Sequence, residues 1–265
     1  MLLSVSHETV YHYPDSVSGM VQQMRLTPLD GPGQRVLSWT VDIEGGTREF
    51  DYVDNNGNRV ALVSTPGGTE RISIRASGQV ETTDQNGIIG ETDDTMPLWC
   101  YQRQTPLTGA GDGVRSLLGG LAASEVTPGD LHNLSRRIID RVPYIGGRTD
   151  ATTDAEQALD IGAGVCQDHA HIFIAAARSV GIPARYVSGY LMLNDRVEQE
   201  ASHAWAEAWL DGLGWVGFDV SNRISPDERY IRLATGLDYR DAAPVRGVRF
   251  GDTPETLIVS LQVQQ

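Results

Sequence analysis

Apolar and polar residues alternate through about the first 85 residues of the chain, where helical periodicity is almost absent. Such alternation is typical of β-strands that bury one face. It predicts six strands, at residues 3–13, 19–26, 35–43, 49–54, 59–64 and 71–82. Between the fourth and fifth strands, the run D-N-N-G-N at 54–58 predicts a tight hairpin turn, because Asn and Gly accept positive φ angles. Six short strands separated by turns of this kind indicate a small β-sandwich.

Helical signals begin after residue 113. Thr127 and Asp130 supply an N-cap and an acid at the third helical position, with a proline between them, and they predict a helix of about 14 residues. Thr153 and Glu156 predict the capping box of a second, short helix. Gly162 follows the last apolar residue of that helix and predicts its end.

The changes of pattern along the chain predict its domain organisation. Residues 88–113 are rich in Gly, Thr, Asp and Pro, which is typical of a linker. We therefore predict a β-sandwich domain at 1–87, a linker at 88–113 and a second domain at 114–265. Later strands are expected at 184–191, 230–233 and 256–263, and the charged loop at 194–200 is expected to be solvated or to form a rim over a cleft.

A third helix is predicted from residue 164 onward, with a cysteine at its start. The apolar residues behind it recur at helical spacing until Gly181 and Pro183 end the pattern: Ala170, Phe173, Ile174, Ala177 and Val180. Cys166 thus lies in the first turn, where unpaired N–H groups and the helix dipole favour the thiolate over the thiol. The same N–H groups can hold an oxyanion. Taken alone, such a cysteine is more often a small buried residue that packs a helix against a sheet.

Two alternating segments after this helix change that balance. Residues 202–210 read S-H-A-W-A-E-A-W-L and residues 214–220 read G-W-V-G-F-D-V, and the Gly-containing turn between them predicts a β-hairpin. His203 and Asp219 lie on one face of this hairpin if the numbers of paired residues have an even sum. The carboxylate can then orient the imidazole while the other ring nitrogen reaches Cys166, as in a cysteine hydrolase or acyltransferase. Singly, each residue also fits an ordinary structural role.

Four motifs in this order resemble those of the bacterial transglutaminase-like proteins, whose core is shared with papain-like cysteine peptidases. They are G-V-C-Q-D-H-A-H at 164–171, G-I-P-A-R-Y-V-S-G-Y at 181–190, S-H-A-W-A-E-A-W at 202–209 and G-W-V-G-F-D-V-S-N at 214–222. The resemblance implies that Cys166, His203 and Asp219 form a catalytic triad. The N-terminal strands are similar to the β-domain that accompanies this family, so the resemblance spans nearly the whole chain.

Two departures from the family pattern are visible. The family's Asp-Pro-Thr-Asn is replaced by D-V-S-N at 219–222, and its Gly-Arg-Asp-Tyr is replaced by G-L-D-Y at 236–239. Neither change removes a member of the triad. A substrate contact made by the family's arginine does not carry over to this chain.

Composition narrows the range of partners. The formal net charge of −14 argues against nucleic acids and anionic membranes as partners. All 21 cationic side chains are arginines, so the chain cannot cross-link to itself through lysine. Two cysteines make no disulfide framework, and Cys100 is expected to be an ordinary thiol. With no basic start followed by an apolar run and no long apolar span, we expect a cytoplasmic protein. The oligomeric state is left open.

Several other side chains have both a functional and a structural interpretation. His7 and His12 are interpreted as surface histidines on a strand, because no ligand cluster joins them. His169 is interpreted as structural and Asp168 as a helix cap. Trp205 and Trp209 share the face of His203 and either wall a substrate groove or pack in the sheet. By chemistry alone, the candidates for a second oxyanion donor are Gln167, Tyr144 and Tyr190.

The sequence predicts an α+β, papain/transglutaminase-like catalytic core preceded by a small β-sandwich domain. We expect Cys166 to attack a peptide or carboxamide carbonyl, His203 to act as acid and base, and Asp219 to orient the imidazole. Trp205, Gln167 and Tyr190 are the predicted substrate-binding residues, the substrate is a peptide or protein, and no cofactor or metal is expected. Hydrolysis is favoured. The alternatives are transfer to an amine, an arylamine N-acetyltransferase activity, for which no coenzyme A motif is visible, and a non-catalytic protein-binding module.

Overall fold

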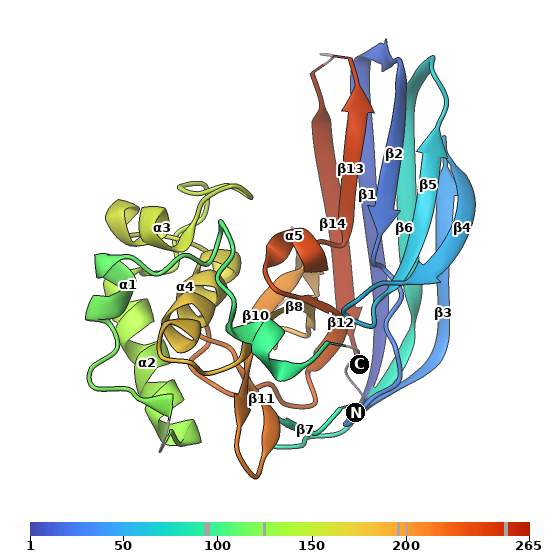
Figure 1. The fold of residues 1–265 in the computed structure, drawn as a ribbon. Coiled ribbons are helices and arrows are strands. Elements are labelled where there is room, and N and C mark those ends of the chain that lie inside the picture. Colours follow the sequence, from blue (N-terminus) through green and yellow to red (C-terminus); the bar gives the residue numbers. More distant parts are fainter. Residues whose placement is uncertain (93–95, 124–125, 195–196, 200, 252–253) are drawn as a thin grey trace.

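Three antiparallel sheets organise the chain in the computed structural model, which describes residues 1–92, 96–123, 126–194, 197–199, 201–251 and 254–265. Two sheets form a β-sandwich, and the third lies between this sandwich and a group of helices (Figure 1). The fold is therefore the α+β arrangement that the sequence predicts: a transglutaminase-like core with an N-terminal β-rich region.

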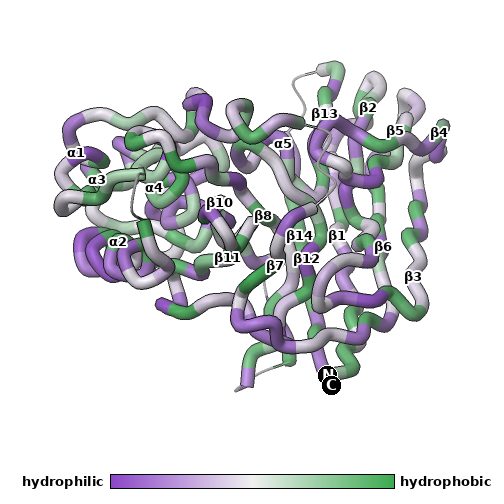
Figure 2. The backbone as a smooth tube through the Cα atoms, turned by 60° about the horizontal axis from the view of Figure 1, so that its bottom comes forward, coloured by the Kyte–Doolittle hydropathy of each residue, from purple (hydrophilic) through white to green (hydrophobic). Residues whose placement is uncertain are grey.

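The sandwich contains all six strands predicted from the first 82 residues. They are β1 (Leu2–Val17), β2 (Gly19–Met24), β3 (Gln34–Glu44), β4 (Thr47–Val53), β5 (Arg59–Thr65) and β6 (Thr69–Thr82). Figure 2 shows hydrophilic and hydrophobic residues alternating along these strands. The predicted turn joins β4 to β5, where Gly57 adopts a φ of 79°, which glycine accepts without strain.

The last strands of the chain return to the sandwich. β13 (Val245–Phe250) pairs with β2, and β14 (Thr256–Gln264) pairs with β1. The sheet orders are β3-β6-β1-β14-β9 and β13-β2-β5-β4, in which β9 (Glu198–Gln199) lies within the predicted charged loop. The assignment of the whole segment 114–265 to the catalytic domain is therefore corrected: alternation predicts a strand, but it does not identify a distant partner.

The third sheet has the order β12-β8-β10-β11-β7. Its strands are β7 (Ile88–Gly90), β8 (Ala184–Leu191), β10 (His203–Leu210), β11 (Gly214–Phe218) and β12 (Tyr230–Gly236). β7 comes from the predicted linker and pairs with β11. The remaining elements are η1 (Leu98–Gln102), a 3₁₀ helix, and the α-helices α1 (Asp112–Ser116), α2 (Pro128–Arg141), α3 (Ala155–Ile161), α4 (Cys166–Ser179) and α5 (Tyr239–Ala242).

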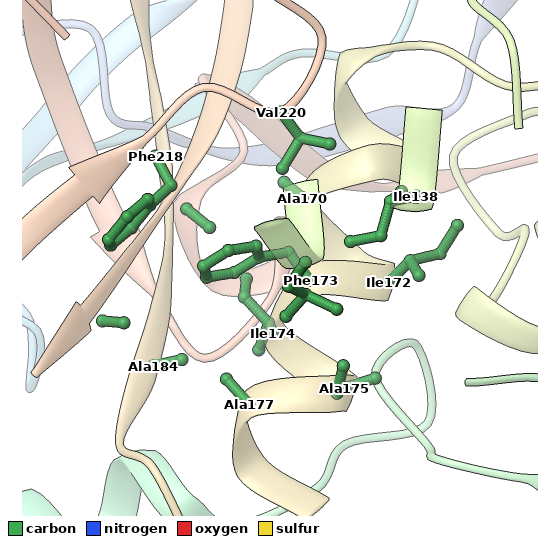
Figure 3. Packing of buried hydrophobic residues seen from close by; sticks show 14 of the residues in the cluster. Ile138, Ala170, Ile172, Phe173, Ile174, Ala175, Ala177, Ala184, Phe218 and Val220 are labelled. Carbon is green, nitrogen blue, oxygen red and sulfur yellow. The ribbon is translucent and has the colours of Figure 1, made fainter. Parts of the chain in front are cut away.

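Helix α4 packs across one face of this third sheet. The even-numbered residues of β10, from Ala204 to Leu210, lie in one buried cluster with the apolar residues of α4. In this cluster the rings of Phe173 and Phe218 stack with their centroids 5.2 Å apart (Figure 3). The small alanine side chains of β10 let the helix approach the sheet closely, and this packing fixes the start of α4 relative to the start of β10.

The helix caps agree with the sequence in one case and differ in the other. Thr127 and Asp130 form the predicted capping box of α2. In α3 the box is formed by Asp154 and Gln157, one residue later than predicted. Thr153 accepts instead from the Asp150 N–H, and the Glu156 carboxylate accepts from three N–H groups at the start of α1: Gly111, Gly113 and Val114.

Side-chain amides of the sandwich bind the edge strand of the third sheet. The Gln34 amide donates to the Arg232 carbonyl and accepts from the Arg232 N–H, at 2.9 and 2.8 Å. The Asn58 amide makes the same pair of bonds with Thr235, at 2.7 and 2.8 Å. These contacts satisfy backbone groups at the free edge of β12 and fix the sheet to the sandwich. Within the described residues, no helix is both long enough and apolar enough to cross a membrane.

Candidate active site

Cys166 is the first residue of α4, as the sequence predicts. The carboxylate of Asp168 caps the helix by accepting from the Val165 N–H and from the Thr149 hydroxyl, each at 2.7 Å. The N–H groups of Cys166 and Gln167 lie in the first turn, where no intrahelical acceptor exists. The half-buried thiol therefore lies beside backbone donors that are able to bind an anion.

The hairpin of β10 and β11 has the register that the triad requires. Ala206 pairs with Phe218, so the sum of paired residue numbers is even. His203 and Asp219 meet with 2.6 Å between the imidazole Nε2 and the carboxylate Oδ2. Because an ionised carboxylate only accepts, Nε2 carries the proton in this contact. The Nδ1 nitrogen is then the one that can exchange a proton with Cys166.

The electrostatics of the pair favour two charged partners. Burial by itself lowers the pKa of His203, but the charge and hydrogen bond of Asp219, with a smaller contribution from the Cys166 side chain, raise that pKa to about 10. Burial also opposes ionisation of Asp219, but His203 and the hydrogen bonds from Asn222 and Tyr230 hold the pKa of Asp219 below its usual value. The site thus favours an imidazolium held by a buried carboxylate next to the Cys166 sulfur.

Comparison with known protein families agrees with this geometry. Residues 122–220 match the family model of the transglutaminase-like superfamily core. Residues 3–81 match that of the bacterial transglutaminase-like N-terminal region. The chain belongs to the transglutaminase-like superfamily.

The relatives of this transglutaminase-like chain include an uncharacterized protein of Mycobacterium leprae, which is 28% identical over 280 residues, 98% of each chain. A protein-glutamine gamma-glutamyltransferase of Pseudomonas aeruginosa is 32% identical over 107 residues, 36% of this chain and 16% of that protein. A crystal structure of a candidate cysteine protease from Cytophaga hutchinsonii has a TM-score of 0.76 and 23% identity, over 100% of this chain and 91% of that one. The last comparison shows a shared fold.

Tyr144 lies beside the thiol of the transglutaminase-like core. The backbone of Tyr144 forms a bridge with Gly164, two residues before Cys166, and the Ile145 N–H donates to the Gly164 carbonyl at 2.9 Å. Burial, followed by the charges of Cys166 and Asp219, raises the pKa of Tyr144 to about 12. The side chain is 56% exposed, so it presents a protonated hydroxyl at the surface of the site.

Tyr190 lies elsewhere, which corrects its prediction as a substrate-binding residue. It is fully buried, its hydroxyl lies 3.0 Å from Nδ1 of His7, and its ring stacks on Trp39 of the sandwich. His7 is accordingly a buried histidine of the domain junction, and the prediction that it lies on the surface is wrong, whereas His12 is exposed. His7 lies on the same face of β1 as the buried Leu3 and Val5, and its ring packs edge-on against Tyr190 of the third sheet, a contact that the sequence could not show.

Trp205 does not line an open groove beside Cys166. It is 3% exposed, its ring packs edge-on against Tyr230 at 5.4 Å, and its centroid lies 6.2 Å from that of His203. Trp209 packs against Trp215 instead, at 5.7 Å. Trp205 thus packs against the imidazole of His203, which is a structural role rather than a direct contact with substrate.

His169 has the structural role expected of it. It is buried, Nε2 lies 2.7 Å from the Val142 carbonyl, and Nδ1 lies 2.8 Å from the Ser221 hydroxyl. These two contacts join α4 to the end of α2 and to the segment after Asp219. Gln167 stays half-buried beside Cys166 at the start of α4, consistent with its predicted position but without a demonstrated role.

Two residues around Asp219 carry contacts that sequence reasoning did not assign. Asn222 donates to Oδ2 from its side chain at 2.7 Å and to Oδ1 from its backbone at 3.1 Å. The Tyr230 hydroxyl donates to Oδ2 at 2.7 Å. The sequence did contain a signal for the Asn222 contact, since an amide three residues after an acid is well placed to donate a hydrogen bond to it. The sequence contained no such signal for the Tyr230 contact, because Tyr230 is a single aromatic residue at the start of a strand.

A cavity of about 450 Å³ lies on the other face of the third sheet. The loops before β3 and β5 and the segment leading into β7 form one side, and Trp205, Glu207 and Tyr230 form part of the other. Neither Cys166 nor His203 lines it. Tyr230 therefore separates this cavity from the buried carboxylate of Asp219.

Proposed function

We propose that this chain is a cysteine-dependent hydrolase of peptide or carboxamide bonds, with Cys166, His203 and Asp219 as its triad. The observation that carries the proposal is the contact between Asp219 and His203 Nε2 at 2.6 Å, which leaves Nδ1 for the thiol at the start of α4. Membership of the transglutaminase-like superfamily supports an enzyme that works through a thiol.

In the first half-reaction, the Cys166 thiol gives its proton to Nδ1 of His203, and the sulfur attacks the carbonyl carbon of the substrate. The oxyanion is held by the N–H groups at the start of α4 and by the Tyr144 hydroxyl. As the carbon–nitrogen bond breaks, His203 gives its proton to the leaving amine and a thioester remains on Cys166. Asp219 stabilises the imidazolium before this transfer and keeps the ring in the tautomer that presents Nδ1 to the sulfur.

In the second half-reaction, water replaces the amine. His203 takes a proton from the water as its oxygen attacks the thioester carbon. The carbon–sulfur bond then breaks, His203 returns the proton to the departing sulfur, and the acid is released while the thiol is restored. An amine in place of water gives an amide product by the same steps, so the acceptor alone decides between hydrolysis and transfer.

Packing around the site supports water as the acceptor. An amine-transferring enzyme protects its thioester by excluding water. The sequence offered Trp205, Trp209 and Trp215 as walls for such a tunnel, but Trp205 packs behind His203 and the other two pack on each other. Tyr144, beside the thiol, is largely exposed. The resemblance of 107 residues to a protein-glutamine gamma-glutamyltransferase keeps amine transfer as the second candidate.

The experiment is a single-turnover assay with peptide and γ-glutaminyl substrates, in which the acyl-enzyme is trapped and mapped by mass spectrometry. We expect an adduct on Cys166 that Cys166→Ala abolishes and Cys100→Ala retains. The trapped thioester is then divided between water and a primary amine at millimolar concentration. Mostly acid product supports the hydrolase, and mostly amide product replaces it with a transamidase. If no substrate and no alkylating agent reacts with Cys166, the chain is a non-catalytic binding module.

A further inference from the structure

The Asp219 carboxylate is held by residues from three separate segments. Its Oδ2 atom accepts from His203 on β10, from the side chain of Asn222 and from the hydroxyl of Tyr230 on β12. Asp219 and Tyr230 are both buried. An oxygen with three donors within 2.7 Å has little freedom to move, so its position follows the positions of the donors.

Tyr230 contacts the imidazole as well as the carboxylate. The centroids of the Tyr230 and His203 rings are 6.0 Å apart, and Trp205 packs against both rings. Tyr230 also starts the strand whose outer edge is bound by Gln34 and Asn58 of the sandwich. A single side chain therefore joins the acid and the base of the triad to a strand that the sandwich fixes in place.

We propose that Tyr230 is a positioning residue of the triad, whose hydroxyl aligns the Asp219 carboxylate with His203 Nε2. The proposal rests on the proposed function and extends it to a residue outside the segment 122–220 that matches the superfamily core. With the hydroxyl in place, the carboxylate stays ionised and points along the Nε2–H bond. Without it, the carboxylate keeps Asn222 but can rotate away from the imidazole.

The phenol is a donor at every working pH. Burial, followed by the negative charge of Asp219, raises the pKa of Tyr230 far above its ordinary range. Other titratable and charged groups lie around the contact between Tyr230 and Asp219. They are His203, Cys166, His169, Tyr144, Asp227 and Arg229. Tyr230 itself therefore does not titrate in the activity profile, and its effect is exerted through Asp219 and His203.

The test compares Tyr230→Phe with Tyr190→Phe. Both changes remove one hydroxyl from a buried ring in the third sheet, but the Tyr190 hydroxyl contacts His7 in the domain junction. We expect Tyr230→Phe to lower kcat about 10-fold, with KM within about twofold, because Asn222 still holds the carboxylate. Its activity profile should also lose its alkaline limb at a lower pH. Tyr190→Phe should change thermal stability and leave kcat unaltered.

A second background separates positioning from a general structural effect. In Asp219→Ala, the further change Tyr230→Phe should alter kcat by less than about twofold, since the residue through which it acts is gone. Equal losses in both backgrounds, or an unchanged kcat in Tyr230→Phe, overturn the proposal. If Cys166→Ala keeps its activity in the same assay, the proposed function fails instead, and the two failures are distinguishable.

One measurement needs no Tyr230 variant. In the wild-type protein, proton NMR should detect a Tyr230 hydroxyl that is protected from exchange, and Asp219→Ala should abolish that protection. Protection that survives in Asp219→Ala, or a hydroxyl that exchanges as fast as an exposed phenol, overturns the proposal even if Tyr230→Phe does not fold.

Discussion

The substitution Asp219→Asn tests how far the triad depends on charge rather than on shape. Three donors within 2.7 Å point at Oδ2, so the amide oxygen of Asn must take that place. The amide NH2 group then takes the place of Oδ1, where it faces the Asn222 N–H that donates in the wild type at 3.1 Å. The fold and the Nε2 contact of His203 should survive. What is lost is the negative charge next to the imidazolium.

The expected loss of kcat in Asp219→Asn follows from the pKa of His203. The pKa of His203 is raised from 6.5 to about 10, which corresponds to about 5 kcal/mol in favour of the imidazolium. Asp219 supplies most of this preference and Cys166 a smaller part. A loss of about 3 to 5 kcal/mol in a step that uses the imidazolium lowers kcat by a factor of about 10² to 10⁴. The same range is typical of other triads that lose their acid.

The pH dependence has a defined direction. Because the folded pKa of His203 is raised, its contribution to stability is complete below about pH 6.5 and is lost as the pH rises through about 10. The lowered pKa of Asp219 adds a contribution that is present above its ordinary value of 3.8 and is lost in acid. The difference in thermal stability between wild type and Asp219→Asn should therefore be largest between about pH 4 and 6.5 and should shrink toward pH 10.

The assay is single-turnover acylation followed by mass spectrometry, with unfolding curves recorded across this pH range. Asp227→Asn is the matched control, because Asp227 is a partly buried aspartate in the loop before β12 that pairs with Arg229 at 2.6 Å. We expect no loss of activity in the control. An unchanged kcat/KM in Asp219→Asn would refute the reasoning and assign the orienting role to another acid.

Three further outcomes are expected. Iodoacetamide near pH 6 should label Cys166 faster than Cys100, because only Cys166 combines a helix start with an imidazole; equal rates in peptide mapping would contradict this. Tyr144→Phe should lower kcat by about 10-fold with little change in KM if its hydroxyl donates to the oxyanion, and an unaltered kcat would leave this to backbone groups. Asn58→Ala removes both bonds to the Thr235 backbone and should cost about 1 to 3 kcal/mol in denaturant unfolding, whereas exposed Asn133→Ala should cost much less.

Much of the fold follows from local signals in the sequence. The strands at 184–191 and 59–64 were predicted to within one residue, because alternation and flanking turns act over a few residues. Helix α2 begins where Thr127 and Asp130 place it, since its capping box uses only neighbouring groups. The cap of α3 was wrong by one residue because Thr153 and Asp154 both carry a suitable oxygen, and only the folded chain shows which one is used.

The elements that sequence reasoning missed depend on distant partners. Nothing in the alternation of 256–263 shows that it pairs with β1, more than 240 residues earlier, rather than with the strand before it. The same limit applies to Tyr190, which became a candidate for the site by its chemistry alone and whose hydroxyl contacts His7 of the sandwich instead. Tyr230 likewise becomes recognisable only in the folded structure, where Asp219 accepts a hydrogen bond from its hydroxyl.

His203 shows why predicting the correct face of β10 did not predict which residues of that face belong to the site. The odd-numbered residues do share one face, as the alternation indicates, but Trp205 and Glu207 on that face line the cavity toward the sandwich. The even-numbered residues pack under α4. Only the first residue of β10 lies at the end of the strand, where an odd-numbered side chain can reach the start of α4. His203 thus contacts both layers. Its ring packs against Trp205 and Tyr230, and its nitrogens bind Asp219 and interact with Cys166. A change in the sandwich can therefore reach His203 through β12, because Tyr230 on that strand both packs against the imidazole and holds the acid.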